Sequence, residues 1–184
     1  MTDPRTEGGW NAAWRALGVA APDGLYAELL AAWSEPQRHY HTLQHLGECL
    51  TLAEELRDEM DHPAEVVLAL WFHDAVYDVR AHDNEARSAQ WADRVLREAG
   101  VAADARKRIM DLIMVTCHRA ADAPASQDSA ILIDIDLAIL GSSEPRFAEY
   151  ETQIRAEYAW VPPDVFTVKR REVQRGFLAR ERIY

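Results

Sequence analysis

Long apolar runs, cysteine and lysine are all scarce in this chain of 184 residues. No stretch reaches the roughly 18 consecutive apolar residues that a membrane-spanning helix needs, because charged residues interrupt every candidate. Two cysteines without a closely spaced pair exclude a disulfide framework and a thiolate zinc site, so Cys49 and Cys117 are expected as small core residues. The first residues lack the basic and apolar regions of a secretory signal. We therefore expect a soluble, cytoplasmic protein.

Negative charge predominates, since 31 Asp and Glu residues oppose 20 Lys and Arg residues and give a net charge of −11. Such a surface repels nucleic-acid backbones, so we expect no non-specific nucleic-acid binding. A small phosphorylated ligand in a locally cationic pocket is compatible with this charge. Nearly all of the cations are arginine, which a high-GC coding bias explains more simply than a need for phosphate recognition.

Helix-forming residues dominate, and glycine and proline number only eight each. Apolar residues recur at three- and four-residue steps, which predicts an all-α fold: a single multi-helix bundle of eight or nine helices over residues 1–184. The expected helices are Trp10–Leu17, Asp23–Trp33, Thr42–Met60, Pro63–Asp78, Asn84–Ala99, Ala103–His118, Ser126–Leu140, Pro145–Ala159 and Asp164–Arg182. Thr42 is expected to cap a helix start, Pro63 to occupy a first turn, and Gly100 to end a helix in the left-handed conformation.

The tryptophans are expected to fill the core rather than to stack on bases. Those concerned are Trp10, Trp14, Trp33 and Trp160. The C-terminal helix, which is rich in arginine and aromatic residues, is expected to pack on its own bundle. The chain is therefore predicted to be a monomer or a homodimer.

Ionisable side chains interrupt several of the apolar helices. They are His45, His73 with Asp74, His118, and Asp134 with Asp136. An ionised carboxylate buried in the apolar stretch 130–140 costs on the order of several kcal/mol unless a cation or strong donors meet it. A divalent metal ion would satisfy all of these groups, and mixed imidazole and carboxylate sites suit Mn, Fe, Co, Ni or Zn. The simpler alternatives are a helix-end role for His118 and ion pairs between the two aspartates and arginines.

The order of these residues along the chain resembles the motif of a known protein family. His45, His73-Asp74 and Asp136 resemble the His, His-Asp and distant Asp of the HD-domain metal-dependent phosphohydrolases, and in particular a bacterial branch of uncharacterised predicted HD phosphohydrolases. The segments that carry the resemblance are residues 38–41 (Arg-His-Tyr-His), 71–78 (Trp-Phe-His-Asp-Ala-Val-Tyr-Asp), 83–85 (Asp-Asn-Glu), 134–141 (Asp-Ile-Asp-Leu-Ala-Ile-Leu-Gly) and 177–184 (Phe-Leu-Ala-Arg-Glu-Arg-Ile-Tyr). The resemblance spans nearly the whole chain and implies an HD-domain-like helical bundle.

The resemblance also implies a set of metal ligands. They are His45, His73, Asp74 and Asp136, which would leave positions open for water and a phosphate oxygen. Two residues on a helix that are two positions apart point about 200° away from each other, so Asp134 and Asp136 are not expected to share one ion. The resemblance favours Asp136 as the ligand, because the family usually has a small or apolar residue, then Asp, then a leucine, as in Ile135-Asp136-Leu137. We expect Asp134 and His41 to support the ligand side chains. The candidate ions are Mn, Fe, Co, Ni, Zn and Mg.

The implied reaction is metal-assisted hydrolysis of a phosphate ester or anhydride in a small phosphorylated substrate, with nucleotides among the candidates. Asp78 lies four residues after Asp74 on the same expected helix, and Glu85 begins the next one, so both are candidates for moving the proton. Related alarmone hydrolases have a Glu-Asp pair at the positions of Tyr77 and Asp78. The missing Glu argues against an alarmone substrate.

Three cationic side chains are candidates for binding the phosphate: Arg38, His118 and Arg119. One metal ion is expected, since the adjacent histidine pair typical of two-metal relatives is absent. The main alternative is a catalytically inactive HD module that binds metal or nucleotide in a signalling or scaffolding role. A purely structural metal clamp is the third possibility, but such clamps usually use four strong ligands that include cysteine. The complete ligand set favours the enzyme.

Overall fold

The computed structural model describes residues 3–117 and 125–180, and this part of the chain is helical throughout. Its nine α-helices are α1 (Glu7–Ala16), α2 (Leu25–Ala32), α3 (Leu43–Glu55), α4 (Pro63–Phe72), α5 (Asn84–Glu98), α6 (Ala103–Met114), α7 (Gln127–Leu137), α8 (Glu144–Glu157) and α9 (Pro163–Leu178). Short 3₁₀ turns are η1 (Arg57–Glu59), η2 (Val115–Cys117) and η3 (Ala138–Gly141). With no strand in the described ranges, the predicted all-α bundle is confirmed. Each helix in those ranges is too short or too polar for a bilayer crossing.

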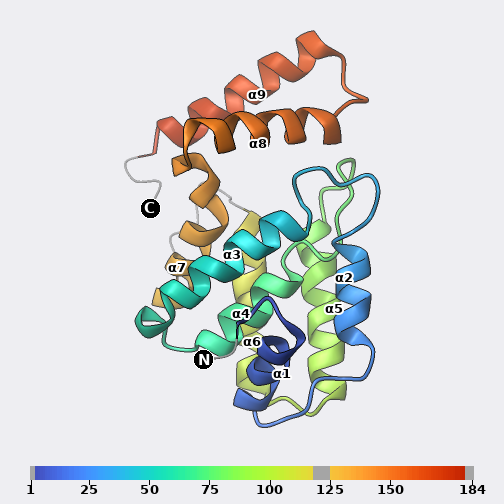
Figure 1. The fold of residues 1–184 in the computed structure, drawn as a ribbon, viewed down its shortest axis with the longest axis vertical. Coiled ribbons are helices and arrows are strands. Elements are labelled where there is room, and N and C mark those ends of the chain that lie inside the picture. Colours follow the sequence, from blue (N-terminus) through green and yellow to red (C-terminus); the bar gives the residue numbers. More distant parts are fainter. Residues whose placement is uncertain (1–2, 118–124, 181–184) are drawn as a thin grey trace.

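Helix α4 is the centre of the bundle (Figure 1). Every residue from Glu65 to Phe72 is buried, and helices α1, α3, α5, α6 and α7 all contact it. A helix that is apolar on all sides is expected where other helices cover it on all sides. Pro63 occupies its first turn, as predicted, because a proline at that position loses no helical hydrogen bond. The other helices are therefore arranged around α4.

Large aromatic side chains fill the core around α4. They are Trp10, Trp14, Trp33 and Trp71, each at most 1% exposed. The indole N–H of Trp33 donates to the carbonyl oxygen of Trp71 at 3.0 Å, which joins the end of α2 to α4. The expectation for Trp160 is wrong, since this side chain is 51% exposed and the guanidinium of Arg80 lies over its ring. Trp160 follows the last turn of α8 and so lies outside the main core.

Local signals in the sequence predict several helix ends correctly. The Thr42 hydroxyl accepts a hydrogen bond from the backbone N–H of Gln44 at the start of α3, and Gly100 ends α5 with a φ of 83°. Of the two cysteines, Cys49 is buried as predicted and Cys117 is only partly buried. Thr42 fixes where α3 begins and so where its first turn points.

Helix α4 ends earlier than predicted, at Phe72 rather than at Asp78. Residues 73–83 form a loop instead, and Asn84 at the start of α5 binds it. The Asn84 side chain accepts from the backbone N–H of Asp78 at 3.1 Å and donates to the Asp78 carbonyl at 2.9 Å. These bonds replace the helical ones that Asp78 would otherwise make. The predicted alignment of Asp78 with Asp74 on one helical face is therefore wrong.

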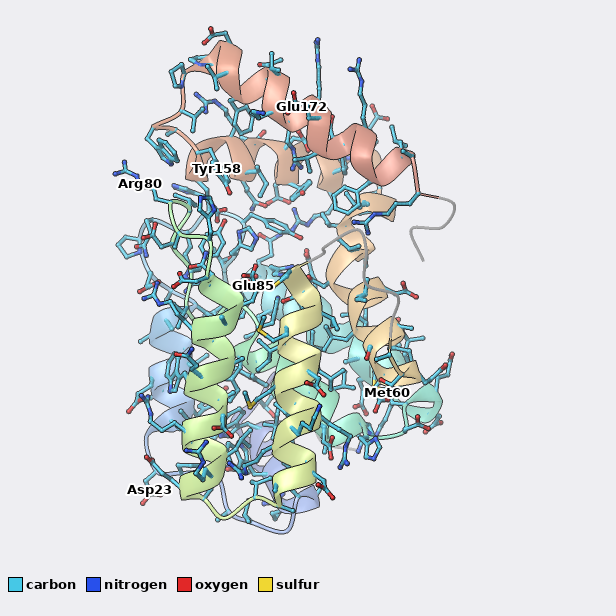
Figure 2. The ribbon with its side chains drawn as sticks, turned by 180° about the vertical axis from the view of Figure 1, so that it is seen from behind. Asp23, Met60, Arg80, Glu85, Tyr158 and Glu172 are labelled. Carbon is cyan, nitrogen blue, oxygen red and sulfur yellow. The ribbon has the colours of Figure 1, made fainter. Side chains whose placement is uncertain are left out.

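Helices α8 and α9 form an antiparallel hairpin that lies across one end of the bundle (Figures 1 and 2). The hairpin packs on a second hydrophobic cluster, separate from the main core. This cluster contains Tyr40, Ile139, Tyr150 and Ile154. The guanidinium of Arg170 on α9 binds the carboxylate of Glu151 on α8 with distances down to 2.6 Å, which ties the two helices together. The space between bundle and hairpin contains the site described next.

The carboxylate of Asp128, in the first turn of α7, holds the segment that leads into α4. It accepts hydrogen bonds from the backbone N–H groups of Asp61 at 2.8 Å and His62 at 3.0 Å. We expect Asp128→Asn to lower the free energy of unfolding by about 1–3 kcal/mol, because an amide donor then faces these donors. Urea denaturation followed by circular dichroism measures the change. The exposed Asp58→Asn control should change by less than about 0.5 kcal/mol, and equal stability of the two variants would contradict the assignment.

Candidate metal centre

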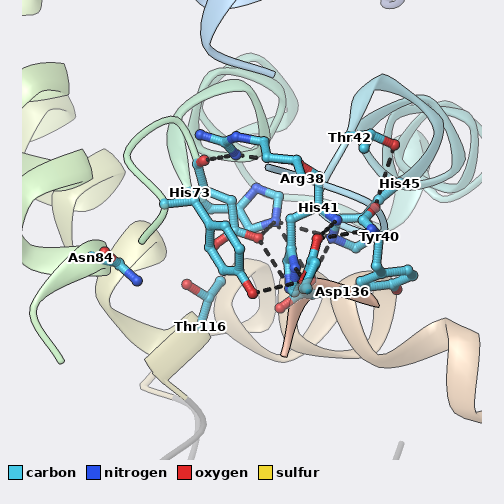
Figure 3. Close-up of polar contacts among 12 residues, drawn as sticks. Arg38, Tyr40, His41, Thr42, His45, His73, Asn84, Thr116 and Asp136 are labelled. Atoms are coloured by element: carbon cyan, nitrogen blue, oxygen red, sulfur yellow. Dashed lines mark hydrogen bonds and ion pairs between the residues drawn. The ribbon is translucent and has the colours of Figure 1, made fainter. Parts of the chain in front are cut away.

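Three helices bring polar side chains to one point (Figure 3). His45 comes from the first turn of α3, His73 from the C-terminal end of α4, and Asp136 from the last turn of α7. The Nε2 atom of His45 lies 3.1 Å from Asp136 Oδ1 and 3.3 Å from His73 Nε2. His73 Nε2 is 3.5 Å from the same Asp136 oxygen. We call these three side chains the donor triangle.

The donor triangle fits a divalent metal ion. Nitrogen and oxygen ligands at about 2.0–2.2 Å from an ion lie about 3.0–3.5 Å from one another in octahedral or tetrahedral coordination. The three observed separations, 3.1, 3.3 and 3.5 Å, fall within this range. His45 and His73 are 3% and 0% exposed, so the two imidazoles are buried against each other. A cation at the centre would satisfy all three donors, and the group could hold a metal ion.

A hydrogen bond on the far side of the ring fixes the orientation of His73. Its Nδ1 lies 2.7 Å from the carbonyl oxygen of Leu70, one turn back along α4. A carbonyl oxygen only accepts hydrogen bonds, so the proton is on Nδ1. In the neutral ring, Nε2 then presents its lone pair to the donor triangle, which is the form in which histidine binds a metal.

Asp74 lies beside the donor triangle rather than within it. Its Oδ2 atom is 3.3 Å from His73 Nε2 and 4.0 Å from the Nε2 of His41. The fold thus brings all four predicted ligands to one place, with three of them mutually close and Asp74 at their edge. His41, predicted to support the ligands, lies next to Asp74.

Carboxylates dominate the electrostatics of this centre. Burial alone would lower the pKa of His73, but the charges of Asp74 and Asp136 outweigh it and raise that pKa to about 9. Burial, followed by the charge of Asp136, raises the pKa of the Tyr40 phenol well above its usual value. The centre therefore attracts positive charge, and a proton and a metal ion compete for the same imidazole nitrogen.

The donor triangle adjoins a cleft of about 890 Å³ between the bundle and the hairpin. Asp74 and Asp136 line this cleft from the bundle. The wall that the hairpin contributes contains five aromatic residues, Tyr150, Tyr158, Trp160, Phe166 and Phe177, together with the cations Lys169 and Arg170. Asp78 and Glu85, the predicted proton-transfer residues, also line the cleft. Figure 2 shows Glu85 at the end of the bundle that faces the hairpin.

Arg38 does not face the cleft, contrary to its predicted role in binding phosphate. Its guanidinium is fully buried and donates to the carbonyl oxygens of Asp74 at 2.6 Å and Ala75 at 3.0 Å. It also donates to the carbonyl of His41 and to the carboxylate of Glu35. The guanidinium of Arg38 has five N–H donors in one plane. It can therefore bind several fixed acceptors at once, which a lysine ammonium would do less well. Arg38 ties the segment before α3 to the end of α4.

The remaining predicted residues lie elsewhere. Asp134 is half-buried on α7, where burial raises its pKa. Asp134 was expected to support a ligand side chain, but the Nδ1 atoms of the two ligand imidazoles face other groups: that of His45 faces the Cys49 thiol and that of His73 the Leu70 carbonyl. His118 and Arg119 lie outside the described residues.

Glu157, the last residue of α8, is a member of the site that the sequence did not indicate to us. Its buried Oε2 atom lies 2.8 Å from His41 Nδ1 and accepts from the Tyr77 hydroxyl at 2.9 Å. Burial alone would raise the pKa of Glu157, but the hydrogen bond and charge of His41 outweigh it and lower that pKa to about 2. A signal was present, because Glu157 continues the spacing of Tyr150 and Ile154 along the buried face of α8.

Comparison of the chain with models of protein families, with curated proteins and with solved structures gives no significant match. The function is therefore inferred from the residues of this chain and their geometry. Three features support that inference: a buried group of metal-type donors, an adjoining cleft, and an imidazole–carboxylate pair at the edge of the donor group.

The raised pKa of His73 makes the stability of the metal-free protein depend on pH. The folded state keeps a proton on His73 up to about pH 9, whereas the unfolded chain loses it near 6.5. The stability that this proton contributes is complete below 6.5 and is lost as the pH rises through 9. With a chelator present, we expect the free energy of unfolding to fall by about 3 kcal/mol over this window. The His73→Gln variant should show a flatter profile, and an equally steep one would assign the effect to another group.

Proposed function

We propose that this chain is a metal-dependent phosphohydrolase with an HD-domain-like fold, in which His45, His73, Asp74 and Asp136 hold one divalent ion. The observation that carries the proposal is the donor triangle, with atoms from three helices 3.1–3.5 Å apart beside a cleft. The ligand order along the chain, which resembles the HD-domain phosphohydrolases, supports phosphate as the group acted on.

An accessible metal centre supports catalysis over a purely structural role. Structural zinc sites are closed by four protein ligands, commonly with cysteine, whereas catalytic sites keep a position free. Here Asp74 and Asp136 line a cleft that is large enough for a small molecule. Cys49 lies 3.7 Å from His45 Nδ1, but burial raises the pKa of its thiol well above the usual value, which favours the protonated form that does not ligate metal.

Imidazole and carboxylate donors suit Mn, Fe, Co, Ni and Zn, and a carboxylate-rich centre is also compatible with Mg. When bound, such an ion supplies Lewis-acid chemistry, lowering the pKa of a water molecule toward ~7 and neutralising charge on a phosphoryl group. The residues of the chain hold the donors in place. Leu70 orients His73, and Arg38 fixes the backbone at Asp74.

Two carboxylates on the cleft wall are suited to moving the proton of the attacking water. The Oδ1 atom of Asp78 accepts a hydrogen bond from the backbone N–H of Arg80 at 2.9 Å, which fixes its position in the loop. Glu85 lies in the first turn of α5 and lines the same cleft. An ionised carboxylate in reach of the water can accept its proton. We assign this role to Asp78 and Glu85 as a pair.

The aromatic wall of the cleft indicates the shape of the substrate. Tyr158, Trp160 and Phe166 offer flat apolar surface opposite Asp74 and Asp136. Such a wall suits a small phosphorylated molecule that carries a flat or apolar group, and a nucleotide has both parts. The phosphate would lie toward the bundle and the flat group toward the hairpin.

Separate replacement of the two aspartates of α7 tests the proposal. Protein loaded with Mn²⁺ is assayed for bound metal and for phosphate release from nucleotides and an aryl phosphate. We expect Asp136→Asn to lower turnover by about 100-fold or more and to lose metal, because a catalytic ion is worth several kcal/mol. Asp134→Asn, the matched control on the same helix, should retain both properties.

The other outcomes are equally informative. Loss of metal in the Asp134→Asn variant alone would contradict the ligand assignment. A wild-type chain that binds Mn²⁺ but releases no phosphate would favour an inactive module that binds metal or nucleotide. A wild-type chain that binds no divalent ion would refute the proposed function.

A further inference from the structure

One face of helix α9 lines the cleft without being buried. The residues of this face recur at three- and four-residue steps along the helix, and all of them line the cleft: Phe166, Lys169, Arg170, Val173 and Phe177. A partly apolar stripe at this spacing normally packs into a core. None of the α9 side chains is buried, however, so this face meets the cleft instead. A molecule that enters the cleft would contact it.

Two cations interrupt this face of α9. Among the described residues that line the cleft, Lys169 and Arg170 are the lysine and the arginine. The bundle wall opposite carries four carboxylates, those of Asp74 and Asp136 among them. Arg38, the described arginine that was predicted to bind phosphate, is buried against backbone carbonyls instead. Within the described part of the cleft, side-chain positive charge is therefore concentrated on α9.

The guanidinium of Arg170 is held in a fixed orientation. Its Nε and Nη2 atoms donate to the carboxylate of Glu151 at 3.1 and 2.6 Å, and its charge lies over the ring of Tyr150, 4.9 Å from the centroid. The side chain is only 14% exposed, so little reorganisation is needed when a ligand binds. Glu151 compensates part of the positive charge. A second cation is therefore needed to bind an anion tightly.

Lys169 supplies that second cation. Its Nζ atom lies 2.8 Å from an oxygen of Glu172, and the two side chains are 72% and 56% exposed. An ion pair in such contact with water contributes little stability. The ammonium can therefore exchange Glu172 for a phosphate group, which carries more negative charge than a carboxylate. The fixed guanidinium and the mobile ammonium lie on adjacent residues of one helix.

Aromatic rings separate these cations from the metal centre. The ring of Tyr150, which Arg170 covers, lies 4.5 Å from the ring of Tyr40, and Tyr40 lies 4.8 Å from the ring of His45. Because two rings intervene, one phosphate group is not expected to contact both the metal ion and Arg170. The cations of α9 would therefore meet a different group of the same molecule.

We propose that Lys169 and Arg170 form a second anion site in the cleft, which binds a second phosphate group of the substrate. This inference rests on the function proposed above and narrows its substrate class to a molecule with a flat group and two separate phosphates. One phosphate would lie at the metal ion and the other at α9. The flat group would contact the aromatic side chains that neighbour the cations, Tyr158 and Phe166 among them.

Binding of two nucleotides to the metal-free protein tests this site apart from catalysis. Adenosine 5′-phosphate and adenosine 3′,5′-bisphosphate share the flat group and one phosphate, and differ by the second phosphate. Each is titrated in the presence of a chelator, and the amide NMR signals of residues 166–177 report the dissociation constant. We expect the bisphosphate to bind about 10-fold more tightly, because it gains charge-assisted hydrogen bonds to Lys169 and Arg170.

Three variants of exposed residues on α9 predict different directions of change. Lys169→Met should lower the preference for the bisphosphate about 3–10-fold, because it removes one cation of the site. Glu172→Gln should raise that preference about 2-fold, because Lys169 loses the carboxylate that competes with the ligand. Arg171→Met removes the same charge from the next residue, which does not line the cleft, and should leave the preference unchanged. Lys169 is replaced rather than Arg170, because Arg170 also ties α9 to α8.

The outcomes distinguish this inference from the proposed function. If the wild-type chain binds the two nucleotides equally well, or if Lys169→Met and Arg171→Met lower the preference equally, the second anion site is refuted and the metal centre is unaffected. If the preference depends on Lys169 but the Mn²⁺-loaded protein releases no phosphate from either nucleotide, the anion site stands and the proposed hydrolase function is overturned.

Discussion

Repulsion and desolvation among buried ionisable groups are the constraint on which the rest of this structure depends. The buried rings of His45 and His73 lie 3.3 Å apart, with Asp136 and Asp74 against them. Such a group is stable only when positive charge lies at its centre. The donor atoms must also stay within a few tenths of an ångström of their positions, which requires rigid helices. The fully buried helix α4, with tryptophans packed around it, supplies that rigidity.

The residues that could be predicted from the sequence are those whose chemistry conflicts with their surroundings. His45, His73 and Asp136 are polar side chains in apolar helical stretches, and burying them requires a partner. Asp134 shares this feature, so the preference for Asp136 came from the resemblance to the HD-domain pattern rather than from burial. Helix starts and stops were predictable for a similar reason, because Pro63 and Gly100 act through their own backbone geometry within one turn. Neither kind of signal depends on knowing which helices are neighbours.

The features that could not be predicted depend on tertiary contacts. Helix α4 ends at Phe72, and the loop that follows is held at Asp78 by Asn84 of the next helix, a contact that only the folded chain provides. The Arg38 side chain is buried because it donates hydrogen bonds to carbonyl groups that only the folded chain brings together. Glu157 meets His41 across 116 positions of sequence, so its role follows from the placement of the hairpin. Its place on an apolar stripe was the one available hint.

The central claim is that the donor triangle binds a divalent metal ion, and anomalous X-ray diffraction from crystals soaked in Mn²⁺ tests it most directly. The account predicts one strong anomalous peak within about 2.0–2.3 Å of His45 Nε2, His73 Nε2 and carboxylate oxygens of Asp74 and Asp136. A peak at Asp134, or well-ordered crystals with no peak among these side chains at saturating Mn²⁺, would contradict it.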